Sequence, residues 1–407
     1  MPNLRVQCCI AGGGPAGMML GYLLARSGVS VAVLEKHVDF LRDFRGDTIH
    51  PSTLEVMQEL GLLTDFLKLP HERVTRFAAQ FGTETYSIAD FSQLRVACPY
   101  IAFMPQWDFL SFLAERGKSL PGFKLLMPAK ATELIERDGV VEGLRAETLD
   151  GPIDIAADLV VAADGRHSDV RAAAGLVPVS YGAPMDVLWF ALSRKPGDPE
   201  TTMGRFDRGR IFVQLNRGDY WQCAYVIPKG KADEIKAAGI TAFHKKLTAI
   251  VPAFASRTDE LASVDDLKLL TVQVDRLPVW HKPGLIVIGD AAHAMSPVGG
   301  VGINLAIQDA VAAANLLAGP LKSGAPTVAD LSRVQTRRDF PTRVTQRLQI
   351  VMQNAIIGPA LKGDAPVQAP LLVRLLDRVP WLRRVPARLM GLGVRPEHVA
   401  PEIRSAA

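Results

Sequence analysis

The chain has 407 residues, of which 48% are hydrophobic and 22% charged, and its formal net charge is +4. This length allows two domains or one large elaborated domain, and the composition is typical of a soluble enzyme with a substantial core. The charge is too small to indicate nucleic-acid binding. The four cysteines have neither zinc-site nor disulfide spacing, which argues against enzymes that need a closely spaced redox-active pair. No window approaches the roughly 18–20 uninterrupted apolar residues of a membrane span, so we expect a cytoplasmic protein.

The N-terminal segment predicts a strand, a glycine-rich turn, a helix and a second strand. Residues 5–11 form the first strand and lead into the sequence GGGPAG. Gly12 permits a tight turn, Gly14 lets a pyrophosphate approach the backbone, and Gly17 lets helix and strand pack closely. The second strand ends at Glu35, whose carboxylate can bind both hydroxyls of an adenosine ribose and disfavours a 2′-phosphate. The segment therefore predicts a site for FAD or NAD rather than NADP. Its candidate contact residues are Gly12, Gly14, Pro15, Ala16, Gly17, Glu35 and Lys36.

The next segment carries two arginines and a predicted helix at 51–60. Arg42 and Arg45 follow the nucleotide acid closely enough to reach a pyrophosphate or a flavin edge, and Arg45 is the preferred candidate. His50 directly precedes this helix, and we interpret it as a helix-start residue rather than a catalyst. Alternating residues predict strands between 76 and 103, followed by a helix that starts at PQWD.

The middle of the chain is rich in predicted strands. One of them, at residues 159–163, leads into the sequence DGRHSDVR. Further strands are predicted at residues 187–192, 210–215, 220–227 and 267–274, around a helical stretch at 232–250. Their antiparallel, aromatic-rich pattern predicts a sheet with a ligand-facing side, although core packing explains most aromatic stripes without a ligand.

A third motif follows a buried strand predicted at residues 285–288. It reads GDAAHAMSPVGGVGINLAIQDA and places Asp290 where that strand ends. Its glycine turn is followed by a helix predicted at 304–317. The free backbone N–H groups at the start of this helix can solvate negative charge. A long helix is predicted at 328–356, and short helices with arginines beside leucines at 366–404. We favour a solvated amphipathic cap for these short helices, with a peripheral membrane face as the alternative.

The three motifs together resemble the single-component FAD-dependent aromatic hydroxylases, flavoprotein monooxygenases with the para-hydroxybenzoate hydroxylase fold. They occur in the family's order and spacing between Gly12 and Ala310. The resemblance implies an α/β fold, with a Rossmann-like FAD-binding domain interleaved with a sheet-rich (α+β) substrate domain, plus C-terminal helices. The implied boundaries are 1–75, 103–179 and 277–345 for the FAD-binding domain, 76–102 and 180–276 for the substrate-binding domain, and 346–407 for a C-terminal helical cap.

The resemblance also implies roles for single residues. Gln106 touches the FAD ribose region, and Asp290 binds the ribityl chain. The turn at 297–304 wraps the isoalloxazine, with N–H groups aimed at its N1–C2=O edge. Asp164 and Arg171 serve both the flavin pyrophosphate and a visiting nicotinamide nucleotide. The cofactor-binding candidates from the resemblance are Arg45, Gln106, Asp164, Gly165, Arg171, Gly289, Asp290, Pro297, Gly300, Val301, Gly302, Ile303 and Asn304.

The implied activity is that of an NAD(P)H-dependent flavoprotein monooxygenase. The resemblance implies tightly but non-covalently bound FAD, with NAD(P)H as a transient co-substrate because only one nucleotide fingerprint is present. O2 would then form a C4a-hydroperoxyflavin that hydroxylates a small aromatic or heteroaromatic substrate. The chemistry is centred on the flavin, which Pro297 and Gly299 line, and no metal site or general base is identifiable; His50, Tyr220 and His293 are interpreted as structural.

Other activities share parts of this pattern. The main alternative is an FAD-dependent reductase or dehydrogenase that acts on double bonds without oxygen insertion, and another is a non-enzymatic FAD-binding module. A flavin halogenase is disfavoured because Cys223 and Tyr225 stand where that group carries two tryptophans. Baeyer–Villiger oxidation or epoxidation stays open within the monooxygenase class. The substrate, the choice between NADH and NADPH, and the oligomeric state also stay open.

Overall fold

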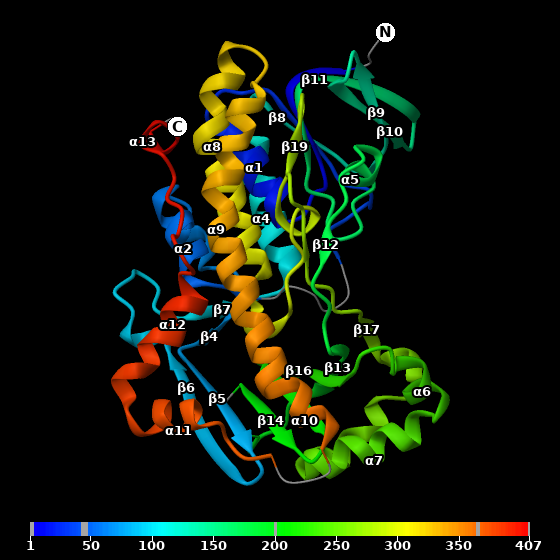
Figure 1. Cartoon of the computed structure of the whole chain (residues 1–407), viewed down its shortest axis with the longest axis vertical. Helices are drawn as coiled ribbons and strands as arrows, with labels where there is room; N and C mark the ends of the chain where they lie inside the picture. Colours follow the sequence, from blue (N-terminus) through cyan, green and yellow to red (C-terminus); the bar gives the residue numbers. More distant parts are fainter. Residues whose placement is uncertain (1–3, 42–47, 199–201, 364–366, 406–407) are drawn as a thin grey trace.

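The computed structural model describes residues 4–41, 48–198, 202–363 and 367–405. Figure 1 shows two main sheets, one above the other, with two long helices running beside them. The contacts predicted for Arg42 and Arg45 lie outside the described residues.

The first sheet is built on parallel strands in the order β20-β11-β1-β2-β8. These strands are β1 (Leu4–Ala11), β2 (Val31–Leu34), β8 (Phe123–Leu126), β11 (Gly151–Ala162) and β20 (Leu285–Val287), with antiparallel β9 (Ala129–Arg137), β10 (Val140–Thr148) and β19 (His281–Lys282) added at the margins. Alternate residues of β1 enter different cores, Cys8 and Ile10 on one side and Cys9 and Ala11 on the other. A strand covered on both faces needs an uninterrupted apolar sequence, which the second half of β1, from Cys8 to Ala11, has.

The second sheet has seven strands in the order β17-β13-β16-β15-β14-β5-β6. They are β5 (Arg76–Phe81), β6 (Glu84–Asp90), β13 (Met185–Ser193), β14 (Met203–Asp207), β15 (Arg210–Asn216), β16 (Tyr220–Pro228) and β17 (Lys268–Leu270). Two separate parts of the chain meet here, because β14 pairs in parallel with β5. Helices α6 (Ala232–Ala237) and α7 (Ile240–Ile250) cover one face, and α10 (Gly358–Lys362) packs on the other.

A small third sheet lies between the first and the second sheet (Figure 1). It consists of β3 (Thr48–Ile49), β7 (Ile101–Phe103) and β4 (Glu72–Val74), in the order β3-β7-β4. The helices around the first sheet are α1 (Pro15–Arg26), α2 (Pro51–Glu59), α3 (Leu63–Phe66), α4 (Gln106–Lys118) and α5 (Asp169–Ala173).

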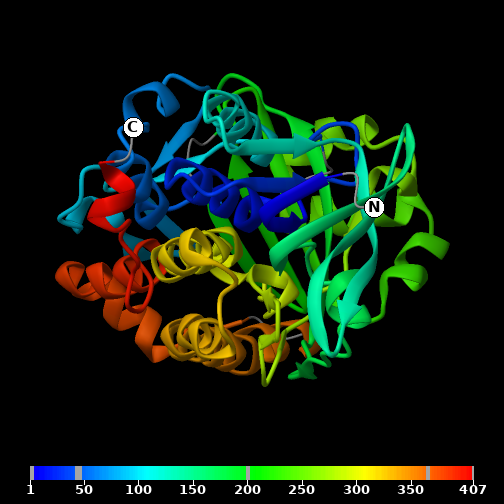
Figure 2. The ribbon, with the colours of Figure 1, turned by 90° about the horizontal axis from the view of Figure 1, so that it is seen from above.

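The described part of the chain after Val301 is helical and contains no strand. Its helices are α8 (Gly302–Ser323), α9 (Val328–Met352), α10, α11 (Leu371–Arg378), α12 (Arg384–Gly391) and α13 (Pro401–Arg404). Figures 1 and 2 show α8 and α9 side by side, and the chain after α12 returning past α2. One helical stretch, Val298–Ser323, is long and apolar enough to cross a membrane, but 78% of its apolar window is buried inside the protein. That burial fits a core helix.

Three predicted elements differ from the structure. The strand predicted at 267–274 is wrong beyond Leu270, because the Val272 N–H donates to the Asp186 carboxylate at 2.9 Å rather than to a neighbouring strand. The helix predicted at 232–250 is two helices, broken at Gly239 with φ +82°. The long helix predicted to reach residue 356 changes at Gln353 into a π-helical turn that ends at Ile357, and α10 follows with Pro359, which lacks an N–H group, in its first turn.

Candidate functional site

The glycines of the first motif allow β1, α1 and the end of β11 to approach closely. Gly12 has φ +108°, and a Cβ atom there would lie 2.4 Å from the Ala163 carbonyl oxygen. A Cβ on Gly17 would lie 2.0 Å from the Gly12 carbonyl oxygen. A Cβ on Gly14 would meet nothing within 4 Å, and Gly14 caps α1 without any side chain. The start of α1 therefore presents an open face beside unpaired helix N–H groups, the arrangement that binds a phosphate.

Glu35 lies at the end of β2, next to this turn. Its buried carboxylate accepts hydrogen bonds from the backbone N–H groups of Gly13 at 3.2 Å and His37 at 3.1 Å. These bonds hold the carboxylate beside the glycine turn, where the sequence places the ribose. The neighbouring Lys36 is exposed, and Pro15 and Ala16 form the first turn of α1.

The second and third motifs meet at the carboxyl ends of β11 and β20. The Arg166 Nη2 donates to the Asp290 Oδ2 at 3.3 Å, and both side chains keep some exposure. The buried Arg171 guanidinium donates to the carbonyl oxygens of Ala291 at 2.8 Å and Arg166 at 3.0 Å. Arg171 therefore braces the two motifs against each other, and its predicted contact with a nucleotide stays a prediction. Arg166 is not among the predicted site residues, although it belongs to the second motif.

Asp164 is held within its own loop. Ser168 Oγ donates to Asp164 Oδ1, and the Val170 N–H donates to its Oδ2 at 3.2 Å. Burial raises the pKa of Asp164 above its ordinary value, although these two hydrogen bonds act in the opposite direction. The adjacent Gly165 has φ +87°, which favours glycine at this turn.

A buried charged network supports the backbone under Gly289. Asp309 of α8 accepts the Gly289 N–H at 3.1 Å, the His293 ring nitrogen lies 2.6 Å from the same carboxylate, and Arg338 of α9 donates at 2.9 Å. Burial alone would raise the pKa of Asp309, but His293 and Arg338 together hold it below its ordinary value. Glu397 reaches this network through Arg338 at 3.5 Å. The position of His293 agrees with its interpretation as structural.

The turn predicted to wrap the isoalloxazine is fixed to the third sheet. Gly299 and Gly300 have φ +81° and +62°, and a Cβ on Gly300 would lie 2.7 Å from Thr48 Oγ1. The Asn304 Oδ1 accepts hydrogen bonds from the His50 N–H at 2.9 Å and the Thr53 hydroxyl at 2.8 Å, and its amide donates to the Thr48 carbonyl oxygen at 3.1 Å. The Asn304 side chain is thus used internally, which leaves its backbone N–H group for the predicted flavin contact.

The structure places His50 at the N-cap of α2. Its ring is fully buried, and Nδ1 lies 2.7 Å from the Met390 carbonyl oxygen. Since a carbonyl oxygen only accepts, Nδ1 carries the hydrogen. Burial lowers the pKa of His50 to about 4, against the opposing effect of the Met390 carbonyl. This environment fits a neutral structural histidine.

Three glutamines, from α9 and the π-helical turn that follows it, bind the backbone directly before and at the start of the glycine turn at 297–304. We call them the glutamine ladder: Gln346, Gln349 and Gln353. Gln349 accepts the Ser296 N–H at 3.2 Å and donates to the carbonyl oxygens of Ser296 and Val298, each at 2.9 Å. Gln353 donates to the Ser296 hydroxyl at 2.6 Å, and Gln346 donates to the Ala294 carbonyl oxygen at 3.1 Å. Side chains from far along the sequence therefore fix the backbone that leads into Pro297.

Other predicted residues are placed less directly. Gln106 is the first residue of α4 and is half-buried, and within the described part of the chain no hydrogen bond links its side chain to the motifs. Val301 is the N-cap of α8, which begins with Gly302 and Ile303. All three are half-buried, so their backbone N–H groups stand at the predicted flavin-facing helix start.

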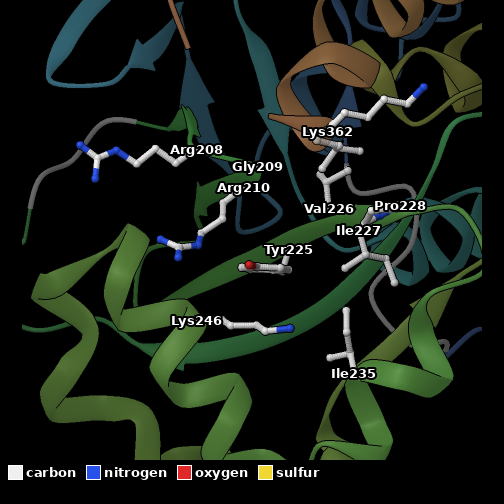
Figure 3. Close-up of a pocket in the computed structure, with 11 residues that line it drawn as sticks. Arg208, Gly209, Arg210, Tyr225, Val226, Ile227, Pro228, Ile235, Lys246 and Lys362 are labelled. Carbon is white, nitrogen blue, oxygen red and sulfur yellow. The ribbon is translucent and has the colours of Figure 1, made fainter. Parts of the chain in front are cut away.

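A pocket of about 280 Å³ lies elsewhere, at one end of β15 and β16 (Figure 3). The figure shows Tyr225 between Arg210 and Lys246, with Ile235 on the helical side. Burial raises the pKa of Tyr225, although Arg210 opposes this shift. None of the predicted cofactor residues lines the pocket, so it is separate from the candidate site.

The arrangement of the three motifs fits a dinucleotide with a flavin ring. An open helix start faces the place for a pyrophosphate, Glu35 stands at the place for a ribose, and Asp290 of the third motif lies beside Arg166 of the second. A glycine turn that is fixed on both sides leads into a second helix start at α8. Within the described residues no group of three metal-ligating side chains occurs.

Comparison with known proteins agrees with this assignment. Residues 5–348 match the family model described as an FAD binding domain. The chain is 31% identical to 6-methylpretetramide 4-monooxygenase of Streptomyces rimosus, over 95% of this chain and 92% of that protein. It is 24% identical to para-nitrophenol 4-monooxygenase of Pseudomonas sp. (strain WBC-3), over 78% of this chain and 79% of that protein.

Solved structures confirm the predicted fold class. PqsL, a probable FAD-dependent monooxygenase from Pseudomonas aeruginosa, has a TM-score of 0.75 at 21% identity and covers 88% of this chain and 99% of its own. The anhydrotetracycline hydroxylase OxyS from Streptomyces rimosus has a TM-score of 0.74 at 24% identity, over 96% of this chain and 77% of its own. The chain belongs to the family of FAD-dependent aromatic hydroxylases and is an FAD-binding oxidoreductase of the flavoprotein monooxygenase type.

Proposed function

We propose that this enzyme uses NAD(P)H and O2 to hydroxylate a small aromatic or heteroaromatic substrate. The observation that carries the proposal is that the predicted flavin turn meets an apolar face of the second sheet. Val298 packs in one cluster with Trp189 and Val213 of that sheet and with Leu361 of α10. A flat apolar ring held between this face and a flavin would be shielded from water. The relatives named for 6-methylpretetramide and para-nitrophenol support an aromatic substrate.

The residues of the chain would bind and orient the cofactor. When bound, FAD supplies the redox chemistry, because it accepts a hydride from NAD(P)H and, once reduced, activates O2 for transfer of one oxygen atom. Glu35 would hold the adenosine ribose and Asp290 the ribityl chain. The N–H groups of Gly302 and Ile303 at the start of α8 would stabilise negative charge on the N1–C2=O edge, since a helix N-terminus favours an anion. No described side chain is assigned as a general base.

We also propose the interleaved domain division, on the basis of sheet membership. Strands β5 and β6 lie in the same sheet as β13 to β17, although β7 and β8 stand between them in the sequence and belong to other sheets. The enzyme is proposed to work in the cytoplasm, where cysteines stay reduced. All four cysteines are buried and unpaired, which supports that location.

The function is tested by oxidation of NADH and NADPH in the presence of a panel of phenols, aminoarenes and heteroaromatic compounds. A substrate should accelerate NAD(P)H oxidation in air and yield a product that carries one additional oxygen. Anaerobic reaction should stop after a single reduction of the flavin. Continued turnover without O2, with a product that gains only hydrogen, would identify the reductase activity instead.

A further inference from the structure

The outer side of α11, α12 and the turn between them is apolar and exposed. We call it the α11–α12 face. Leu371 is 83% exposed, Leu372 66% and Trp381 60%. The remaining large apolar members of the face are Leu375, Val385 and Leu389. Soluble monomers rarely expose so many large apolar side chains together, and such a patch marks a site of interaction.

These side chains are not core residues that have turned outward, because the inner side of the same helices is filled. Val373 of α11 is buried in a cluster with Ala79 and Phe81 of β5. Ala387 of α12 is buried against Phe91. Figure 1 shows both helices at the outer margin of the second sheet. The helices are therefore apolar on two sides, and only the inner side has a partner within the described residues.

The charge of the face decides which partner fits. Five arginines stand between Pro370 and Gly391, and Asp377 is the single acidic residue there. Asp377 is already engaged, because it accepts the Ser87 N–H at 2.9 Å and lies 3.6 Å from the Arg383 guanidinium. The exposed Arg378, Arg384 and Arg388 form no salt bridge with any carboxylate that the structure describes. Arg384 instead lies over the Trp381 ring, at 5.7 Å from its centroid.

A second copy of this chain is a poor match for such a face. A two-fold contact would place the same arginines opposite one another, and within α11 and α12 only the engaged Asp377 could pair them, while Glu55 of α2 acts on Arg388 from outside these helices. An anionic lipid surface offers phosphates to the arginines and an apolar boundary to the leucines. Tryptophan, leucine and arginine on short helices are the residues that lie in a membrane interface.

We propose that the α11–α12 face docks the enzyme on an anionic membrane surface, as a peripheral contact that does not span the bilayer. Leu371, Leu372 and Trp381 enter the boundary between headgroups and acyl chains. Arg378 and Arg388 pair with lipid phosphates. The favoured interpretation from sequence, a solvated cap, accounts for the inner side of these helices but leaves the outer leucines unexplained. The proposal does not depend on the substrate or on the oxidation chemistry.

The test is sedimentation of the FAD-loaded protein with lipid vesicles. The wild type should bind mixed phosphatidylglycerol/phosphatidylcholine vesicles and bind phosphatidylcholine alone at least tenfold more weakly, with binding reduced by salt. The double variant Leu371→Asp/Leu372→Asp should lose at least tenfold in affinity. Leu149→Asp is the matched control, because Leu149 is 82% exposed on the turn between β10 and β11, and it should bind like the wild type.

Two further measurements test the charged and the apolar contribution to vesicle binding separately. Arg378→Glu/Arg388→Glu should remove the preference for anionic vesicles while FAD content stays that of the wild type. Trp381 fluorescence should shift to the blue on vesicles, and Trp381→Phe should abolish that shift.

Three outcomes would overturn the proposal. The wild type could fail to bind anionic vesicles, or the double leucine variant could bind them as the wild type does. Sedimentation velocity could also show that Leu371→Asp/Leu372→Asp converts a dimer into a monomer. This last result would assign the face to a contact between subunits.

Discussion

Substitution of Gln349 by methionine tests whether the glutamine ladder holds the turn that leads to the flavin. Methionine has a similar length but no hydrogen-bonding amide, so Gln349→Met removes three hydrogen bonds to Ser296 and Val298. At about 1 kcal/mol net for each bond, local opening of the turn should become easier by about 3 kcal/mol, or roughly 100-fold. The buried carbonyl oxygens left without a donor make this a lower bound.

Amide hydrogen exchange of the FAD-free protein measures that opening directly. In Gln349→Met, residues 294–300 should exchange faster by roughly the factor above, while β1 and α1 keep their protection. Gln335→Met is the matched control on the same helix. Gln335 accepts the Trp280 N–H at 3.0 Å and donates to the Pro278 carbonyl oxygen at 2.8 Å. Its loss should leave exchange at 294–300 unchanged.

The FAD-loaded variants then report on the site. If the turn lies at the isoalloxazine, Gln349→Met should alter the visible flavin spectrum and the flavin midpoint potential, whereas Gln335→Met should not. Unchanged exchange in Gln349→Met would refute the role of the ladder. Faster exchange with an unaltered flavin would instead show that the turn lies away from the cofactor.

Three other predictions address the cofactor site and the buried histidine. Asp290→Ala should lower FAD affinity about 10- to 100-fold, as loss of a charge-assisted hydrogen bond of about 1.5–3 kcal/mol implies; purification with a full complement of tightly held FAD would contradict the assignment. Glu35→Ala should weaken FAD binding on the same reasoning, measured by titration of the FAD-free protein, and an unchanged affinity would remove Glu35 from the site. His50 is neutral when folded, since burial lowers its pKa to about 4. The contribution of the neutral His50 to the free energy of unfolding is therefore complete above the unfolded pKa of about 6.5. As the pH falls toward 4, the free energy of unfolding should decrease by up to about 3 kcal/mol. His50→Asn keeps a donor for the Met390 carbonyl and should flatten the unfolding free energy over that pH range; an unchanged slope would show that another group titrates.

The first motif could be predicted from the sequence because its residues are close together along the chain. A buried strand, a glycine turn and a helix start occupy consecutive residues, so the places of Gly12, Gly14 and Gly17 follow from chain geometry over short distances. Glu35 was readable for the same reason, because the end of β2 lies beside the turn that follows β1. The fold class followed from the resemblance that the three motifs carry together, because their order and spacing along the chain match those of the family.

Contacts across long sequence separations were not readable. Asn304 fits a flavin-binding motif by sequence, but its side chain binds residues 48–53, some 250 positions earlier. The glutamine ladder lies within the helix predicted at 328–356, and nothing near it in the sequence identifies the backbone of Ser296 as its partner. Strand β14 was missed because its pairing with β5 spans more than a hundred residues. In each case the partner lies far away in the sequence, so local spacing could not identify the contact.

The central claim is that the enzyme inserts one oxygen atom from O2 into an aromatic ring. Turnover under isotopically labelled O2, with the compound that most accelerates NAD(P)H oxidation, tests this claim most directly. The proposed function predicts that mass spectrometry finds one labelled oxygen in the product and none when only the water is labelled. A product without label, formed equally well in the absence of O2, would contradict it.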